Sequence, residues 1–211
     1  MNIKHIFQII LCACTLLPAQ AQKAQDILDK TAAKLKNSGG IEAVFEATAF
    51  KGTKETGSAG GTIKVKGNKF KIESNSLTTW FDGKTQWTMQ EGDYEVSMTE
   101  PTGVELQTIN PYAFLEIYKR GFNYRMKKGT LSNGSTGYKL FLTADNSKQD
   151  IREIFLEVDS RHNPVRVSIR QGKNQWVRIV VNSFRVSKSF ADGHFTFPKA
   201  KYPNVEIIDL R

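Results

Sequence analysis

Cysteine and histidine are almost absent from this chain. Its only two cysteines, Cys12 and Cys14, lie in the first segment, and the only histidines beyond that segment are His162 and His194. Both histidines sit in turn-like sequence and have no cysteine near them, so they make a poor metal site. With no cysteine available for a disulfide beyond the first segment, the fold must be stabilised by its hydrophobic core.

Sequence signatures of catalysis are missing as well. The phrases nearest to a G-x-S-x-G elbow, Gly57-Ser58-Ala59-Gly60 and Gly134-Ser135-Thr136-Gly137, have the character of turns. No glycine-rich loop carries the Lys-Ser/Thr of a phosphate-binding loop, and no pair of carboxylates stands on an evident shared framework. We therefore expect a protein that is not an enzyme and that needs no cofactor and no metal.

The first 21 residues have the order of a cleavable signal peptide. Met1 to His5 carry a lysine and no acid, and Ile6 to Leu17 form an apolar run shorter than the roughly 20 residues that span a membrane. Ala19 and Ala21 then supply the small residues of a cleavage site. This pattern predicts export to the periplasm, with residues 22–211 as the mature chain, and the alternative is a buried core helix.

A second processing route lies within the same segment. Leu11-Cys12-Ala13-Cys14 resembles a lipobox, and cleavage before Cys14 would leave that cysteine to carry a lipid. The apolar region would then be very short and the mature protein would begin with Thr15-Leu16-Leu17. Cleavage after Ala21 is therefore favoured over lipidation.

Length and charge fit one exported domain. About 190 residues can bury around 70% of the surface of the unfolded chain in a single core. The formal charge of +9 is compatible with nucleic acid, an anionic membrane surface or mere solubility as its cause. Lys64, Lys66, Lys69 and Lys71 alternate with apolar residues, as on the solvated face of a half-exposed sheet. Export disfavours nucleic acid as a partner.

Hydrophobic periodicity predicts an amphipathic helix followed by many strands. Ile27, Leu28 and Leu35 recur at helical spacing within Lys23 to Asn37, and Asn110-Pro111 predicts a second, short helix ending at Lys119. The strand candidates are Ile41 to Ala49, Thr62 to Lys66, Lys69 to Ser74, Leu77 to Phe81, Thr85 to Gln90, Tyr94 to Met98, Phe122 to Lys127, Tyr138 to Thr143, Ile151 to Val158, Val165 to Gln171, Trp176 to Phe184 and Val205 to Leu210.

This order predicts a mainly β fold with a few helices, of the α+β class. Hairpin-length connections make neighbouring strands antiparallel, and a sheet of about ten or eleven strands must curl or close. We expect a single curved antiparallel sheet, an incomplete β-barrel, whose concave side is covered by the N-terminal helix and the short central helix. The stretch from Lys51 to Gly61 is expected to be rich in turns.

Aromatic residues gather around the central hairpin and the short helix, among them Trp80, Trp87, Phe114 and Tyr118. Ordinary core filling explains such a cluster. The other interpretation is that a half-barrel too wide to be filled by its own side chains leaves an apolar cavity. In that case these four residues, together with Phe45, are candidates for its lining.

Three phrases in a fixed order carry a family resemblance. The stretch Val65 to Ile72 is followed by Asp82-Gly83-Lys84-Thr85-Gln86-Trp87, and Phe195-Thr196-Phe197-Pro198 precedes Val205 to Ile207 near the end of the chain. Together they resemble the strand pair, the DGKTLW hairpin, the F-x-F-x-P ending and the final strand of the outer-membrane lipoprotein carrier family, LolA and its relatives. The similarity covers most of residues 22–211.

The resemblance implies a function and a set of site residues. A member of this family takes up the acyl chains of lipoproteins in an apolar cavity, as a monomer, and carries them from an inner-membrane release complex to an outer-membrane acceptor. Leu35, Phe70 and Ile72 match positions that line or rim the cavity, although Ile72 replaces an aromatic residue. An arginine that ties the lid to the barrel in the family is missing, because Val65-Lys66 runs directly into Gly67-Asn68.

Other functions stay open at this point. The chain could carry a different lipid, or serve as a non-catalytic sensor or interaction domain of the envelope on the same fold. An esterase is disfavoured by the missing serine elbow.

Overall fold

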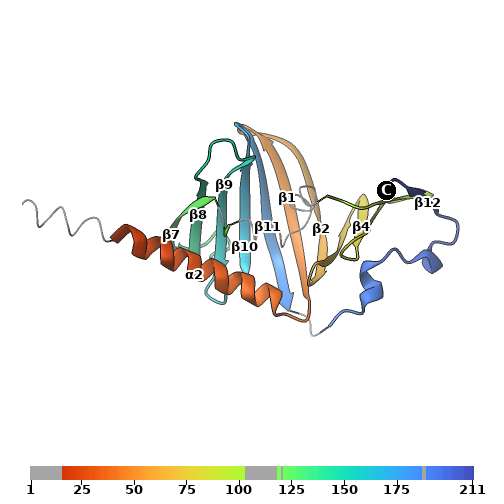
Figure 1. Cartoon of the computed structure of the whole chain (residues 1–211), viewed down its shortest axis with the longest axis horizontal. Coiled ribbons are helices and arrows are strands. Elements are labelled where there is room, and N and C mark those ends of the chain that lie inside the picture. The colour runs from red at the N-terminus through yellow and green to blue at the C-terminus, as the bar shows by residue number, and fades with distance from the viewer. Residues whose placement is uncertain (1–15, 103–117, 120, 187–188) are drawn as a thin grey trace, which may run out of the picture.

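The computed structural model describes residues 16–102, 118–119, 121–186 and 189–211, with side chains from residue 21 onward. Helix α2 (Leu16–Lys36) precedes a single 12-stranded sheet, and Figure 1 shows it crossing the strands of one half of that sheet. None of the helices in these ranges combines the length and apolar character of a membrane span. The strands are β1 (Ile41–Lys51), β2 (Lys54–Lys66), β3 (Lys69–Ser74), β4 (Leu77–Phe81), β5 (Gln86–Gln90), β6 (Glu95–Thr99), β7 (Phe122–Thr130), β8 (Thr136–Ala144), β9 (Ile151–Asp159), β10 (Pro164–Gln171), β11 (Gln175–Val186) and β12 (Glu206–Asp209).

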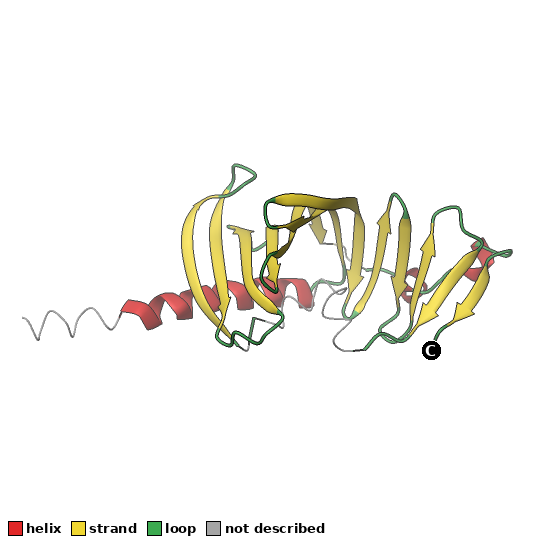
Figure 2. Cartoon of the chain, turned by 90° about the horizontal axis from the view of Figure 1, so that it is seen from above, coloured by secondary structure: helices red, strands yellow, loops and turns green. Residues whose placement is uncertain are grey.

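The sheet is built from two antiparallel meanders, β1 to β6 and β7 to β11. The spatial order is β12-β6-β5-β4-β3-β2-β1-β11-β10-β9-β8-β7, so the pairing of β1 with β11 joins the two meanders into one surface. Figure 2 shows this continuous row of strands from above, with α2 under one half. The mainly β class and the single large open sheet agree with the expectation from the sequence.

Three details of the sheet differ from that expectation. Its strands number twelve rather than ten or eleven. β2 begins at Lys54, because most of the stretch expected to be turns pairs with β1, and these ladder hydrogen bonds outweigh the weak strand propensity of its glycines. Only Gly52 and Thr53 of that stretch form the turn between the two strands. β12 pairs with β6 in parallel, since the long connection from β11 lets the chain return in the same direction.

The helices differ from the expectation too. α2 begins at Leu16 instead of Lys23 and continues through the predicted cleavage site after Ala21. Pro18 is tolerated there because it lies in the first turn, where backbone N–H groups have no partner within the helix. The predicted helix from Asn110 to Lys119 lies outside the described residues, except for Tyr118 and Lys119.

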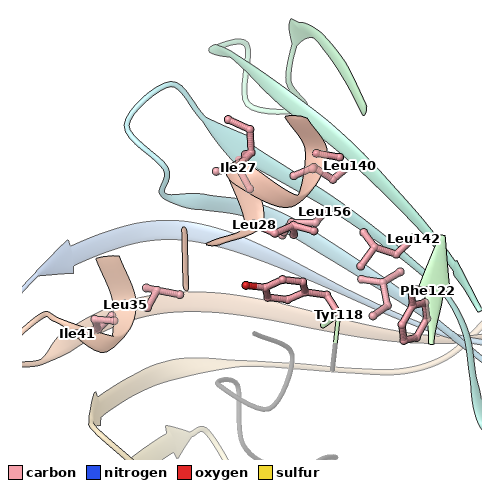
Figure 3. Close-up of a cluster of buried hydrophobic side chains, with 12 residues drawn as sticks. Ile27, Leu28, Leu35, Ile41, Tyr118, Phe122, Leu140, Leu142 and Leu156 are labelled. Atoms are coloured by element: carbon pink, nitrogen blue, oxygen red, sulfur yellow. The ribbon is translucent and has the colours of Figure 1, made fainter. Parts of the chain in front are cut away.

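Residues paired directly across strands point to the same face, so the register divides the sheet into two surfaces. The inner face is defined here as the one that carries Ile41, and α2 packs against it. Figure 3 shows Ile27, Leu28 and Leu35 of α2 over this face. The resulting cluster of buried side chains comprises Ala24, Ile27, Leu28, Leu35, Ile41, Tyr118, Phe122, Leu140, Leu142, Ile154, Leu156 and Val158.

The opposite, outer face is covered at its other end by the chain between β11 and β12. This C-terminal segment, residues 189–205, contains two 3₁₀ turns, η1 (Asp192–Phe195) and η2 (Lys199–Lys201). Its Phe197 and Val205 are buried together with Trp80, Trp87, Met89 and Val96 of β4 to β6. The two ends of the sheet are thus packed on opposite sides, one under α2 and one under the C-terminal segment.

A buried carboxylate lies on the outer face of the half of the sheet formed by β7 to β11. Glu157 of β9 has no exposed surface, and its Oε2 accepts hydrogen bonds from the backbone N–H and the hydroxyl of Ser132. Its Oε1 lies 3.2 Å from Nη2 of Arg166 and 3.8 Å from Nζ of Lys139. A buried charge of this kind stabilises a fold only while its partners are in place.

We predict that Glu157→Ala lowers the free energy of unfolding by about 2 kcal/mol, because it leaves two cations and the Ser132 donors without their acceptor. Glu153 on the same strand and face is the matched control, since it pairs with Arg170 at 2.6 Å but is 39% exposed. Glu153→Ala should cost less than about 1 kcal/mol. Urea unfolding of both variants measures the difference, and equal losses would contradict this assignment.

Candidate functional site

The inner face continues beyond the area that α2 covers. Along β1 and β11 it carries a run of half-buried apolar side chains that belong to none of the three buried clusters formed by the described residues. We name this run the central strip. Its members are Phe45, Ala47 and Ala49 of β1 and, directly opposite them, Val181, Ile179 and Val177 of β11.

Small residues of β2 border the central strip on its other side. Gly61, Ala59 and Gly57 pair with Phe45, Ala47 and Ala49. Glycine is required at position 61, because a Cβ there would lie 2.2 Å from the backbone oxygen of Glu73 on β3. The middle of the inner face is therefore apolar, and it is low in relief on its β2 side.

Four of the residues predicted to line the site lie on the inner face. Phe45 belongs to the central strip, and Leu35 of α2 is buried against the inner face in the cluster of Figure 3. Phe70 is fully buried against Phe81, with ring centroids 5.1 Å apart, and Ile72 packs beside them half-buried. Phe70 pairs with Val65, which pairs with Ile41, and Leu35 is buried in the same cluster as Ile41. The structure thus places Leu35 and Phe70 at the Ile41 end of β1, and the central strip continues along the strand from Phe45.

Tyr118 is also on the inner side, and Phe114 lies outside the described residues. The ring of Tyr118 is fully buried beneath α2, and its hydroxyl donates a hydrogen bond of 2.6 Å to Oδ1 of Asp29 on that helix. Tyr124 donates its hydroxyl proton to the backbone oxygen of Tyr118. Burial, together with the charges of Asp29 and Asp145, raises the pKa of Tyr124. These contacts attach α2 to the sheet through its polar side.

Trp80 and Trp87 lie elsewhere. They are paired with each other across β4 and β5. Trp80 is also paired with Lys71 of β3, whose side chain is on the outer face, so both tryptophan rings point to that face. There they are sealed by the C-terminal segment, with Phe197 5.4 Å from the Trp80 ring. The structure does not bring these two tryptophans together with Phe45, Phe70 and Ile72, and strand parity in the sequence carries the signal for this separation.

Alternation in the sequence could also have revealed the members of the site that were missed. Ala47, Ala49, Val177, Ile179 and Val181 occupy alternate positions of two strands that were predicted correctly. Alanine and valine carry no chemical signature of binding, so only the pairing of β1 with β11 shows that they form one surface.

Charged groups of β2 and β3 lie on the outer face, as predicted, but they are not all solvated. Lys66 and Lys69 approach Oδ1 of Asp192 in η1 at 3.0 and 3.4 Å, and these two lysines lower the pKa of Asp192. Lys71 lies over the ring of Trp80, 5.5 Å from its centroid. The lysines therefore hold the C-terminal segment against the sheet.

His194 of η1 responds to the same charges. Partial burial lowers the pKa of His194 below its ordinary value of 6.5, and Lys64 and Lys71 lower it further. Its Nε2 is buried and has no hydrogen-bond partner among the described residues. Within the part of the chain that the structure describes, no group of His, Cys, Asp and Glu could hold a metal ion.

Comparison with known proteins gives the chain a family match. A family model described as "Outer membrane lipoprotein carrier protein LolA" matches residues 15–173. No curated protein matches the sequence. Among solved structures, an uncharacterized conserved protein from Thermus thermophilus has a TM-score of 0.57 at 14% identity, over 89% of this chain and 99% of the other. That similarity shows a shared fold.

Two further solved structures are similar over most of their length. A LolA superfamily protein from Nitrosomonas europaea has a TM-score of 0.42 at 12% identity, over 82% of this chain and 97% of the other. The lipoprotein LppX from Mycobacterium tuberculosis has a TM-score of 0.48 at 14% identity, over 79% of this chain and 99% of the other.

We predict that His194 makes the fold less stable in mild acid. Its pKa is lower in the folded chain than in the unfolded chain, so the unfolded chain binds the proton more readily. This contribution to stability is fully present above about pH 6.5 and is lost as the pH falls towards the folded pKa. Between pH 8 and 5, the urea concentration at the unfolding midpoint should fall less for His194→Gln than for the wild type. Above pH 7 the midpoints of the two proteins should change with pH in parallel. Parallel curves throughout would show that His194 is not the group involved.

Proposed function

Because the chain belongs to the family of the outer membrane lipoprotein carrier protein LolA, we propose that it is a non-catalytic periplasmic carrier of lipoproteins. It takes up their acyl chains on the inner face of its sheet. It receives them from an inner-membrane release complex and delivers them to an outer-membrane acceptor. The observation that supports this proposal best is the central strip, an apolar surface whose side chains belong to none of the three buried clusters among the described residues.

Hydrophobic burial explains why such a surface suits many clients. An acyl chain in water costs about 0.8 kcal/mol per methylene, so a lipoprotein with several chains cannot cross an aqueous compartment uncovered. Burial depends on apolar area and not on defined hydrogen bonds, so alanine, valine, isoleucine and phenylalanine side chains can cover a chain without recognising the protein attached to it.

Delivery requires that binding remain incomplete. If every methylene were buried at full value, the affinity would approach the practical limit of about 18 to 21 kcal/mol for non-covalent complexes, and release would be too slow. Helix α2 offers a way to weaken binding, because the area it covers adjoins the central strip. Its polar attachments to the rest of the described chain include Lys34 Nζ to Asn163 Oδ1 at 2.6 Å and the Tyr118 to Asp29 hydrogen bond. In our proposal α2 shifts to admit the chains and returns when they leave.

The two faces of β1 provide a test of where acyl chains bind. Phe45 and Val44 are neighbours that point to opposite faces, and all three tryptophans, Trp80, Trp87 and Trp176, lie on the outer face. We predict that brominated fatty acyl chains quench the added emission of a Phe45→Trp variant and leave that of Val44→Trp unchanged, because bromine quenches at contact. Titration of delipidated protein followed by fluorescence measures this. Equal quenching of the two variants would place the lipid elsewhere.

The carrier activity itself is tested with a tri-acylated lipoprotein as client. We predict that the delipidated protein keeps such a client soluble without detergent, and that Phe45→Glu abolishes this while Val44→Glu retains it, because only the former puts a charge into the apolar site. Centrifugation of the mixture and circular dichroism of each variant are the measurements. If the wild type fails, and no lipid accompanies it through purification, the fold serves as an interaction domain and the proposal is wrong.

A further inference from the structure

The chemical character of the inner face changes at β4. From β7 to β3 its described side chains are mainly apolar, but on β4, β5 and β6 it carries hydroxyl and amide groups. Two rows of directly paired residues show this, Thr79 with Thr88 and Ser97, and Phe81 with Gln86 and Thr99. We name the five polar members, Thr79, Gln86, Thr88, Ser97 and Thr99, the hydroxyl lane.

The hydroxyl lane contains an unused acceptor. Nε2 of Gln86 donates a hydrogen bond of 3.3 Å to the hydroxyl of Thr88, which in turn lies 3.5 Å from the hydroxyl of Thr79. Oε1 of Gln86 is buried and accepts no hydrogen bond from the residues that the structure describes. A buried acceptor without a donor costs stability, and in native proteins such a group calls for an explanation. A ligand that brings a donor to Gln86 would satisfy it.

The lane adjoins the apolar part of the site. Gln86 is paired with Phe81, whose ring contacts Phe70, and Thr79 is paired with Ile72. Neighbouring strands are about 4.8 Å apart, so the Gln86 amide on β5 lies two strand spacings from Phe70 and Ile72 on β3. Apolar chains on the inner face could therefore have their polar linkage at the lane.

Charge is absent from the two rows that form the lane. Glu95, two residues from Ser97, is exposed, and Glu100 is paired with Lys84 and Arg211. A carboxylate or a phosphate placed at the lane would lose hydration and find no cation in these rows. An uncharged group with an N–H or O–H suits both the free acceptor and the neutral surroundings.

We propose that Gln86 and the hydroxyl lane bind the uncharged, hydrogen-bond-donating linkage of an acylated ligand whose chains lie on the inner face. This inference rests on the proposed function, because it assumes that acyl chains bind there. The donor is either the amide N–H of an N-acylated lipoprotein or the hydroxyl of a neutral lipid such as a diacylglycerol. Gln86 thus determines which head group the site prefers.

Two pairs of ligands test the proposal and separate the two sources. One pair is a short-chain 1,2-diacylglycerol and its O-acetylated derivative, which lacks the donor. The other is a tri-acylated lipopeptide, with an amide N–H, and the same lipopeptide methylated on that amide nitrogen, which lacks the donor and keeps all three chains. Displacement of a fluorescent fatty acid gives each affinity. In the wild type we expect the donor-bearing member of at least one pair to bind about fivefold more tightly than the other member. This is the affinity ratio that one neutral hydrogen bond, worth about 1 kcal/mol, produces.

Variants assign the preference to Gln86. Gln86→Met should reduce the ratio to about one while chain binding persists, and Gln90→Met, an exposed glutamine of the same strand and parity, should leave it unchanged. A preference in the diacylglycerol pair alone identifies the hydroxyl as the ligand group, and one in the lipopeptide pair alone identifies the amide. A wild type that binds both members of each pair equally, or a Gln86→Met that keeps the preference, overturns this inference and leaves the carrier intact. If none of the four ligands displaces the probe, the carrier proposal fails as well.

Discussion

The pairing of β1 with β11 is the constraint on which the rest of this structure depends. Each meander alone is a curved sheet with two open edges, and only this ladder joins them into one surface. It also fixes which side chains share a face, because a slip of one residue would turn Phe45 and Ala47 outward and Val44 and Glu46 inward. The central strip exists because eleven residue pairs hold that register, with a single irregularity after Val44.

The two faces of the sheet are used differently at its two ends. Under β7 to β9 the inner face is closed by α2, and under β4 to β6 the outer face is closed by the C-terminal segment. The middle of the inner face, beyond the end of β1 at which Leu35 and Phe70 are buried, is left without a cluster of buried residues among those described. The inner face is mainly apolar from β7 to β3 and carries the hydroxyl lane on β4 to β6. It therefore fits a molecule whose long apolar chains lie on the apolar part and whose small neutral head lies at the lane.

The sequence predicts much of this arrangement, because periodicity reports burial. Alternation identified the strands, helical spacing identified α2, and the same patterns placed Leu35, Phe45, Phe70 and Ile72 on elements that meet at the inner face. Pairing between distant strands leaves no such trace. The parallel return of β12 and the strand character of the glycine-rich start of β2 both arise from tertiary contacts, which override local propensity. The outward direction of Trp80 and Trp87 follows from register, which composition alone does not give.

The central claim is that the inner face holds acyl chains. Native mass spectrometry of the protein purified from its native cells tests it most directly, since lipids that enter the site in the cell remain bound in the gas phase. We predict a fraction of the protein that carries additional masses, released by solvent as molecules with acyl chains and reduced in Phe45→Glu. A protein that shows only its own mass from the native source, or the same adducts on Phe45→Glu, would contradict the account.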